Sequence, residues 1–379
     1  MGRRRKTARK PGLEAFLRDY TAGFNVQELR RLLDRDATRA YEVLTRGRRP
    51  AEQPRTRLKR FLLRCKLVFL GISYQLPPAR RLIFGLSVVF AILGVLNVDF
   101  NVSREGTHIS VQSQPLFFVL SLLGMGFLLV MELVDRILVR DELQVARQLQ
   151  RDLLPKDAPQ VPGYAFAHSY RTANDVGGDY YSFLPLADGR LAIAAGDGSG
   201  HGIAAGLLMA IANAVLQTMI EIDPTPARVA ETLHRVLRKT GDHRAFLSLF
   251  YAVLEPATGR LQYVCAGHPF PLLRHADGTV EELGQGGFPL GLRDRLELHP
   301  GEATLAPGDL ILLYTDGLPE AVDPTGTHAF GFDRLRTLLS GGGTAQEVHD
   351  RILKAFELHV GEETLHDDMT IVVMTRPLA

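Results

Sequence analysis

The sequence has 379 residues, more than one typical domain, so two or three folded units are expected. Hydrophobic residues make up 46% and charged residues 23%, which excludes an intrinsically disordered chain. The net charge of +2 hides an asymmetry, because about half of the 44 Lys and Arg residues precede residue 82. The rest of the chain is acidic on balance and suits a cation-binding domain. The two cysteines, Cys65 and Cys265, lie far apart, which predicts no disulfide framework or zinc site and favours a reducing compartment.

Residues 1–80 are predicted to be a basic, cytoplasmic, helical region. Apolar spacing within residues 12–46 predicts one or two amphipathic helices, and an Arg- and Pro-rich linker follows. Residues 61–76 mix apolar side chains with Arg64 and Lys66, as an interfacial helix does. The basic charge fits either nucleic acid or an anionic membrane face. Because the region lacks aromatic interleaving and any recognisable nucleic-acid-binding module, we expect no nucleic acid as a partner.

Two uncharged apolar runs, residues 82–98 and 115–131, follow this region. Each is near the short limit of the roughly 17–25 residues that a membrane-spanning helix requires. A pair of buried helices in a soluble core is the alternative. The short polar loop between the runs favours a two-helix transmembrane hairpin over residues 81–131, and it is too short to be a folded ligand-binding domain.

The charges that flank the two runs predict the orientation of the hairpin. Arg80 and Arg81 precede the first run, Arg136 and Arg140 follow the second, and the loop holds only Arg104. By the positive-inside rule, both termini are cytoplasmic. The sequence therefore predicts a multi-pass protein of the cell inner membrane, in contact with membrane lipid, with the C-terminal domain in the cytoplasm.

Residues 132–155 predict a linker helix that ends at Pro155. Its apolar residues fall on one face, spaced seven, four and four: Leu138, Val145, Leu149 and Leu153. Such a stripe fits pairing with a second copy in a homodimer. Docking of the helix on its own C-terminal domain fits equally well, and both arrangements can hold in different states.

Residues 156–379 alternate short β-branched and aromatic runs with turns, and helical stretches intervene. Strands are predicted at 164–170, 179–184, 191–195, 246–254, 261–265, 310–314 and 370–374. Helices are predicted at 203–222, 226–239, 332–339 and 345–358. Asp188-Gly189 and Asp277-Gly278 predict hairpin turns. This order favours an α+β fold, with antiparallel sheets covered by helices, over a parallel βαβ fold.

Four aspartates stand where a strand begins or ends, each next to glycine or another aspartate. They are Asp179, Asp197, Asp316 and Asp367. Carboxylates that converge in one cleft repel one another unless cations neutralise them. Oxygen ligands favour Mg²⁺ or Mn²⁺, and Gly198 lets its backbone carbonyl approach a metal. Two such ions about 4 Å apart can turn a bridging water into a nucleophile for in-line attack on phosphorus.

Motifs in this part of the chain resemble the SpoIIE-like branch of the type 2C (PPM) protein phosphatases over residues 143–375. The linker carries Leu143-Gln144-Val145-Ala146-Arg147-Gln148-Leu149-Gln150 and Leu153-Leu154-Pro155. Further motifs follow in the family's order: Val176-Gly177-Gly178-Asp179-Tyr180-Tyr181, Gly196-Asp197-Gly198-Ser199-Gly200-His201-Gly202, Ala266-Gly267-His268-Pro269, Pro289-Leu290-Gly291, Thr315-Asp316-Gly317 and Asp367-Asp368-Met369-Thr370.

This resemblance implies a four-layer α-β-β-α sandwich that hydrolyses phosphoserine or phosphothreonine with two Mn²⁺ or Mg²⁺ ions. It implies that Asp197 bridges both metals and that Asp316 and Asp367 complete one site. Asp179 and the carbonyl of Gly198 then serve the other site, partly through water. The family also suggests an anti-sigma-factor antagonist as the phosphorylated protein substrate.

Four positions near these ligands leave alternatives open. Ser182 stands where the family often has an acidic residue, so a catalytically weak membrane scaffold that binds a phosphorylated partner remains an alternative function. For His201 we favour a structural role over that of a general acid, and we also expect His268 to be structural. Asp368 is expected to orient Asp367 rather than to bind a metal.

Overall fold

The computed structural model describes residues 56–96, 100–104, 107–111, 114–240, 245–361 and 365–378. The chain divides into two compact units, Met1–Arg136 and Ile137–Ala379. The helices predicted within residues 12–46 lie outside the described residues, as do residues 97–98 of the first apolar run.

The described part of the first unit is built from three helices and one small hairpin. Helix α4 spans Arg57–Gln75, and helix α5 spans Pro78–Val95. Helix α5 begins with a proline, which is tolerated there because the N–H groups of the first turn have no partner within a helix. Strands β1 (Phe100–Arg104) and β2 (Thr107–Val111) pair antiparallel, so the predicted polar loop contains a β-hairpin. Helix α6 begins at Gln114 and continues to Leu153 in the second unit.

Helices α5 and α6 pack closely against each other within the first unit. Gly124 faces Ser87 so tightly that a Cβ at Gly124 would lie 2.1 Å from the Ser87 hydroxyl oxygen. Toward one end of the pair the rings of Phe90 and Phe117 stack at 6.1 Å, and toward the other Asp135 forms an ion pair with Arg80. These contacts arrange the two helices antiparallel.

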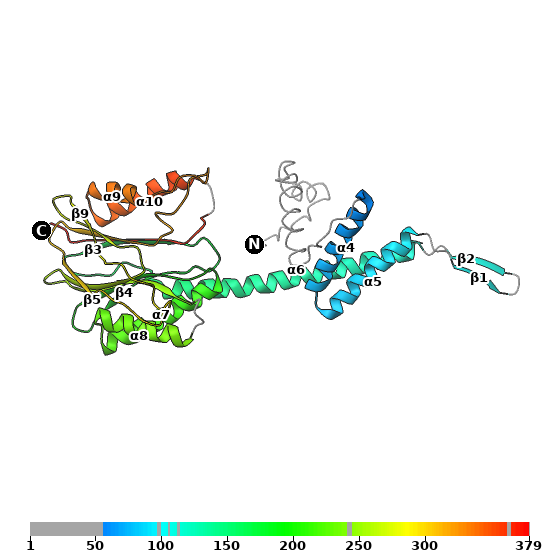
Figure 1. Ribbon diagram of the computed structural model, residues 1–379, viewed down its shortest axis with the longest axis horizontal. Helices are drawn as coiled ribbons and strands as arrows, with labels where there is room; N and C mark the ends of the chain where they lie inside the picture. Colours follow the sequence, from blue (N-terminus) through cyan, green and yellow to red (C-terminus); the bar gives the residue numbers. More distant parts are fainter. Residues whose placement is uncertain are drawn as a thin grey trace, which may run out of the picture. The chain divides into compact units, whose positions relative to one another are not determined.

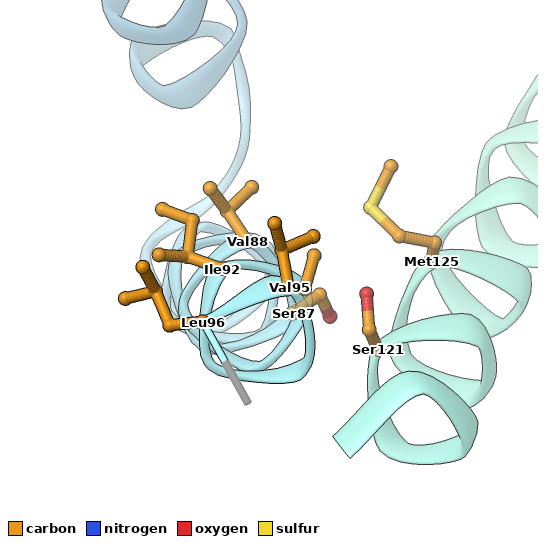
Figure 2. Close-up of a pocket in the computed structure, with 8 residues that line it drawn as sticks. Ser87, Val88, Ile92, Val95, Leu96, Ser121 and Met125 are labelled. Atoms are coloured by element: carbon orange, nitrogen blue, oxygen red, sulfur yellow. The ribbon is translucent and has the colours of Figure 1, made fainter. Parts of the chain in front are cut away.

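An apolar cavity of about 360 Å³ opens beside this packed seam. Figure 2 shows side chains of α5 on one side, and Ser121 and Met125 of α6 on the other. Among the described residues, three helices are long and apolar enough to cross a membrane: α5, α6 and α7 (Ile203–Ile222). Helix α7 buries one face in the core of the second unit.

The second unit contains two five-stranded antiparallel sheets. The first sheet has the order β10-β7-β6-β5-β4, formed by Gly301–Thr304, Arg260–Ala266, Leu247–Glu255, Leu191–Gly198 and Asp179–Pro185. The second has the order β3-β12-β11-β8-β9, formed by Ala165–Arg171, Met369–Thr375, Leu310–Tyr314, Leu272–Arg274 and Val280–Glu282.

Helices cover the outer faces of both sheets. Helix α7 and helix α8 (Pro226–Thr240) lie on the first sheet, and α9 (Phe332–Ser340) and α10 (Ala345–Val360) lie on the second (Figure 1). The unit is therefore a four-layer α-β-β-α sandwich, as predicted.

Strand β11 explains how two cores form in this sandwich. All five of its residues, Leu310–Tyr314, are buried. Successive side chains of a strand point to opposite faces of the sheet, so both faces of β11 are covered. Ile311 and Leu313 join the core between the sheets, while Leu312 and Tyr314 join the core under α9 and α10.

The predicted elements of residues 156–379 agree with the structure in type, and their ends agree within a few residues. Both Asp-Gly hairpin turns are confirmed, one between β4 and β5 and one between β8 and β9. Three short strands were not predicted: β8, β9 and β10. They hold only three or four residues each, so their apolar periodicity is too short to distinguish them from loops.

Candidate functional site

The first two aspartates face each other across neighbouring strands. Asp179 is the first residue of β4, and Asp197 is the residue before the last of β5; the two are direct partners in the antiparallel register. Directly opposed residues of a sheet point to the same face. Strand pairing thus brings together two carboxylates that are 18 positions apart in the sequence.

Asp179 also connects the two sheets. Its side chain is 1% exposed, and its Oδ2 accepts hydrogen bonds from the hydroxyls of Thr315 and Thr370, both at 2.6 Å. Thr315 follows β11 and Thr370 lies in β12, so both donors come from the second sheet. The first aspartate therefore faces the space between the sheets, where buried carboxylate oxygens require donors.

Asp316 and Asp367 lie at one end of the second sheet. Asp316 follows β11 by two residues and Asp367 precedes β12 by two, and these two strands pair antiparallel. A Cβ added to Gly317 would lie 1.9 Å from the carbonyl oxygen of Asp368, so only glycine lets the two segments approach this closely. The glycine at 317 thus allows the segment that carries Asp316 to lie against the segment that carries Asp367.

The acidic side chains of the site raise one another's pKa. Burial raises the pKa of Asp197 to about 8, and the charges of Asp316, Asp367 and Asp368 add to the effect. Burial and the charge of Asp367 raise the pKa of Asp316 to about 6. Burial and the charge of Asp197 hold the pKa of Asp179 well above its usual range. No Lys or Arg is among the groups that shift these three pKa values. A nearby cation would therefore stabilise the charged form of each carboxylate.

The donor set fits a hard divalent cation. Asp316 Oδ1 is buried without a hydrogen-bond partner, which leaves a carboxylate oxygen free for a ligand. A Cβ at Gly178 would lie 2.7 Å from Asp197 Oδ1 and 2.8 Å from the carbonyl oxygen of Gly198, so glycine at 178 keeps both oxygens accessible. Oxygen donors of this kind suit Mg²⁺ or Mn²⁺.

The carboxylates come from the ends of two sheets, and the charges of Asp316 and Asp367 on one sheet also act on Asp197 on the other. Asp179 opposes Asp197 on the first sheet, and the charge of Asp367 acts on Asp316 at the end of the second. Within the described residues, no group of three or more His, Cys, Asp or Glu side chains is placed to hold a metal ion by itself. A cation here needs the carbonyl of Gly198 or water to complete its coordination.

Asp368 holds a loop rather than orienting Asp367 through its side chain. Its Oδ1 accepts from the backbone N–H of Ala173 at 2.8 Å, and its Oδ2 accepts from the N–H of Gly178. The carboxylate of Asp367 instead accepts from the backbone N–H of Asp368 at 2.8 Å. The expectation that Asp368 orients Asp367 is therefore wrong for its side chain, which holds the segment that leads to Asp179.

The two histidines differ from each other. His268 is buried, its Nδ1 bonds the hydroxyl of Ser248 at 2.9 Å, and that hydroxyl accepts from the backbone N–H of Asp197 at 3.1 Å. Burial lowers the pKa of His268 to about 3, so it stays neutral, in agreement with the expected structural role. His201 is exposed and has no hydrogen bond to the rest of the described chain, so the structural role favoured for it has no support.

Ser182 lies on the other face of β4 from Asp179. Strand alternation groups Ser182 with Tyr180, whose hydroxyl donates to Asn213 of α7 at 3.0 Å. An acidic side chain at position 182 would therefore point toward α7 and away from the space between the sheets. The concern that Ser182 weakens a metal site loses its basis in this structure.

Several residues that shape the site were not predicted. The hydroxyls of Thr315 and Thr370 hold the side chain of Asp179, and the hydroxyl of Ser248 holds the backbone of Asp197. The side chain of Gln150 holds the backbone of Gly177, two residues before Asp179. Three of these residues lie in motifs quoted above, but their partners are distant in sequence. Pairing of β5 with β6 brings Ser248 to Asp197, and packing of the second sheet on the first brings the hydroxyls of Thr315 and Thr370 to Asp179.

Comparisons with known proteins agree with this fold. Residues 187–377 match the family model of stage II sporulation protein E (SpoIIE). The phosphoserine phosphatase RsbU of Bacillus subtilis is 28% identical over 247 residues, which cover 63% of this chain and 71% of RsbU. Protein IcfG of Synechocystis is 25% identical over 265 residues, which cover 62% of this chain and 42% of IcfG.

Among solved structures, the SiaA-PP2C domain of Pseudomonas aeruginosa is similar with a TM-score of 0.56 and 23% identity. The match covers 64% of this chain and 98% of that domain. It shows that residues of the second unit form a PP2C-like α+β domain with two antiparallel sheets. The chain spans less than half of IcfG and of RsbP, another B. subtilis phosphoserine phosphatase that it matches.

Proposed function

From the finding that this chain belongs to the stage II sporulation protein E (SpoIIE) family, we propose that it is a protein phosphatase that removes phosphate from serine or threonine of a signalling protein. The observation that carries this proposal is the set of four aspartates at the facing ends of two sheets, with the pKa of Asp197 raised to about 8 by burial and by neighbouring carboxylates. The relatives RsbU and RsbP are named phosphoserine phosphatases, which supports the same reaction here.

The proposed cofactors are two Mn²⁺ or Mg²⁺ ions. Asp197 would be shared between them, Asp316 and Asp367 would hold one, and Asp179 and the carbonyl of Gly198 would serve the other. Bound divalent ions supply positive charge that neutralises phosphoryl oxygens and makes an attacking water more acidic.

The protein itself contributes orientation to this site. Thr315 and Thr370 fix the rotamer of Asp179 by donating to the same oxygen. Ser248 fixes the backbone of Asp197. Side chains that hold ligands in this way reduce the reorganisation needed when substrate binds.

We assign the second unit's residues 156–379 to the phosphatase domain, residues 132–155 to a linker helix, 81–131 to a transmembrane hairpin and 1–80 to a basic cytoplasmic region. The antiparallel packing of α5 on α6 and the ion pair of Arg80 with Asp135 support a hairpin whose two outer ends lie at the same membrane face. By the positive-inside rule that face is the cytoplasmic one, and the phosphatase domain is cytoplasmic.

A homodimer through the linker helix is part of this proposal. Val145 is 61% exposed and Leu149 is 63% exposed on α6, although both are large apolar side chains. Leu154, just after the helix, is 7% exposed within the core of the second unit. The end of the linker thus docks on its own domain, while the stripe before it remains available to a second copy.

The substrate is proposed to be a small phosphorylated signalling domain, such as an anti-sigma-factor antagonist. The test is phosphate release from such a phosphoserine protein by the full chain in lipid nanodiscs, with Mn²⁺ and with EDTA. Wild-type protein should release phosphate only with metal, and Asp197→Ala should lower the rate at least about 100-fold, since even residues that only support metal ligands cost up to that much. A folded, metal-bound wild type without turnover would favour the scaffold that binds a phosphorylated partner.

A further inference from the structure

Gln150 is a buried polar side chain on an otherwise exposed stretch of α6. It is 4% exposed, whereas its neighbour Leu149 is 63% exposed. Burying a carboxamide is unfavourable unless its donors and acceptor are satisfied. The partners that satisfy it therefore indicate what this residue does.

The carboxamide of Gln150 pairs with both polar atoms of Gly177. Its Nε2 donates to the carbonyl oxygen of Gly177 at 2.7 Å, and its Oε1 accepts from the N–H of Gly177 at 2.9 Å. Gly177 is buried and precedes β4, so no neighbouring strand pairs with it. The carboxamide of a glutamine places an N–H donor and a C=O acceptor side by side. Here it makes the two hydrogen bonds to Gly177 that the backbone of a neighbouring strand would otherwise make.

Gly177 is connected directly to the candidate metal site. The next residue, Gly178, accepts from the N–H of Gly198 at 3.0 Å and donates to the carboxylate of Asp368. Asp179 follows it. The backbone N–H and carbonyl of both glycines therefore have hydrogen-bond partners. The partner of Gly177 is Gln150 of the linker helix.

This segment has no room for an alternative path. A Cβ at Gly177 would lie 2.3 Å from both Asp368 Oδ2 and the hydroxyl oxygen of Tyr170. That hydroxyl lies 3.2 Å from Gln150 Nε2, within the same cluster. A displaced Gly177 would therefore press against Asp368, whose carboxylate also accepts from the N–H of Gly178.

We propose that Gln150 is a positioning residue for the metal site: its carboxamide fixes the Gly177 peptide and through it Gly178 and Asp179. The inference rests on the proposed function, because it assigns Gln150 a role at that same site. The alternative is that Gln150 only attaches the linker helix to the domain. In that case a change at Leu154, whose apolar side chain also attaches the helix, should have the same effect as a change at Gln150.

The experiment compares full-length wild type, Gln150→Met and Leu154→Ala in lipid nanodiscs. Gln150→Met keeps the length of the side chain but removes both hydrogen bonds to Gly177. Leu154→Ala weakens the docking without touching Gly177. Gln148→Met is the matched control, because Gln148 is exposed on the same helix and bonds only Asp152 in the described structure. Mn²⁺ binding is measured directly by the loss of the free Mn²⁺ signal in electron paramagnetic resonance, and the melting temperature is measured for each variant.

Gln150→Met should bind Mn²⁺ about 10–100-fold more weakly than wild type, the usual cost of losing a residue that orients a metal ligand. Leu154→Ala should lower the melting temperature but change Mn²⁺ binding less than threefold, and Gln148→Met should change neither. Wild-type Mn²⁺ affinity in Gln150→Met, or an equal loss of affinity in Leu154→Ala, would overturn the proposal. If Gln150→Met does not fold, Gln150→Glu, which keeps the acceptor for the Gly177 N–H, decides by the same comparison.

Phosphate release is measured in parallel and separates the two proposals. Wild-type protein that binds Mn²⁺ but releases no phosphate would contradict the proposed function. The comparison of Mn²⁺ affinity between wild type and Gln150→Met would still decide whether Gln150 positions the site.

Discussion

The two threonines that hold Asp179 allow a ranked prediction. Thr370 makes one side-chain hydrogen bond, from its hydroxyl to Asp179 Oδ2 at 2.6 Å. Thr315 makes two, because its hydroxyl donates to the same oxygen at 2.6 Å and also accepts from the backbone N–H of Thr370 at 3.0 Å. Replacement by valine keeps the shape and exchanges the hydroxyl for a methyl group. We therefore expect Thr315→Val to destabilise the second unit more than Thr370→Val.

The magnitude follows from what each hydroxyl leaves behind. Loss of one donor to a fully buried carboxyl oxygen costs about 1–3 kcal/mol. Thr315→Val also leaves the buried N–H of Thr370 without its acceptor, which adds about 1 kcal/mol or more. At about 2–4 °C per kcal/mol for a domain of this size, Thr370→Val should lower the melting temperature by about 2–12 °C and Thr315→Val by several degrees more.

The assay is thermal unfolding of the full chain in detergent with EDTA, followed by the near-ultraviolet circular dichroism of tyrosine, since the sequence has no tryptophan. Thr218→Val serves as control, because that threonine is exposed and its hydroxyl bonds only the preceding turn of α7. Its melting temperature should change by less than about 2 °C. Equal melting temperatures for Thr315→Val and Thr370→Val, or the reverse order, would refute the assignment of two bonds to Thr315.

Three further predictions concern other parts of the chain. Ser248→Ala should cost about 1–3 kcal/mol in thermal unfolding and slow phosphate release, because it removes the acceptor for the Asp197 N–H and the partner of His268; unchanged stability would contradict this contact. Ser182→Asp should destabilise the domain by more than about 2 kcal/mol without tightening Mn²⁺ binding, because position 182 is buried toward α7. Tighter Mn²⁺ binding would show instead that this position faces the metals. Val145→Asn with Leu149→Asn should shift a dimer to monomer in light scattering while the melting temperature of the second unit is retained, since both side chains are exposed; an unchanged mass would exclude pairing through this stripe.

Much of the fold could be predicted because its strands carry strong local signals. Strand β11 was predicted from Leu310 to Tyr314, as observed, since five consecutive apolar residues between turns leave few alternatives. Gly178 and Gly317, next to Asp179 and Asp316, stand where a Cβ would collide with neighbouring atoms. Local sequence is sufficient where a residue's role depends on its immediate neighbours.

Roles that depend on distant partners could not be predicted. Asp368 was expected to act on its neighbour Asp367, but its carboxylate bonds the backbone of Ala173 and Gly178, nearly two hundred positions away. Gln150 stands in a polar helical stretch, and nothing in its local pattern distinguishes it from Gln148. Such contacts arise only when the sheets and the linker helix come together, because side-chain hydrogen bonds depend on tertiary placement rather than on periodicity.

The number of Mn²⁺ ions bound per chain tests the central claim most directly, namely that four aspartates form one two-ion centre with Asp197 shared. Equilibrium dialysis of the full chain should give two ions for wild type and about one for Asp316→Asn. Asp197→Asn should give none at the same free Mn²⁺ concentration, because loss of the shared ligand weakens both sites. A folded Asp197→Asn protein that still binds two ions would contradict the account.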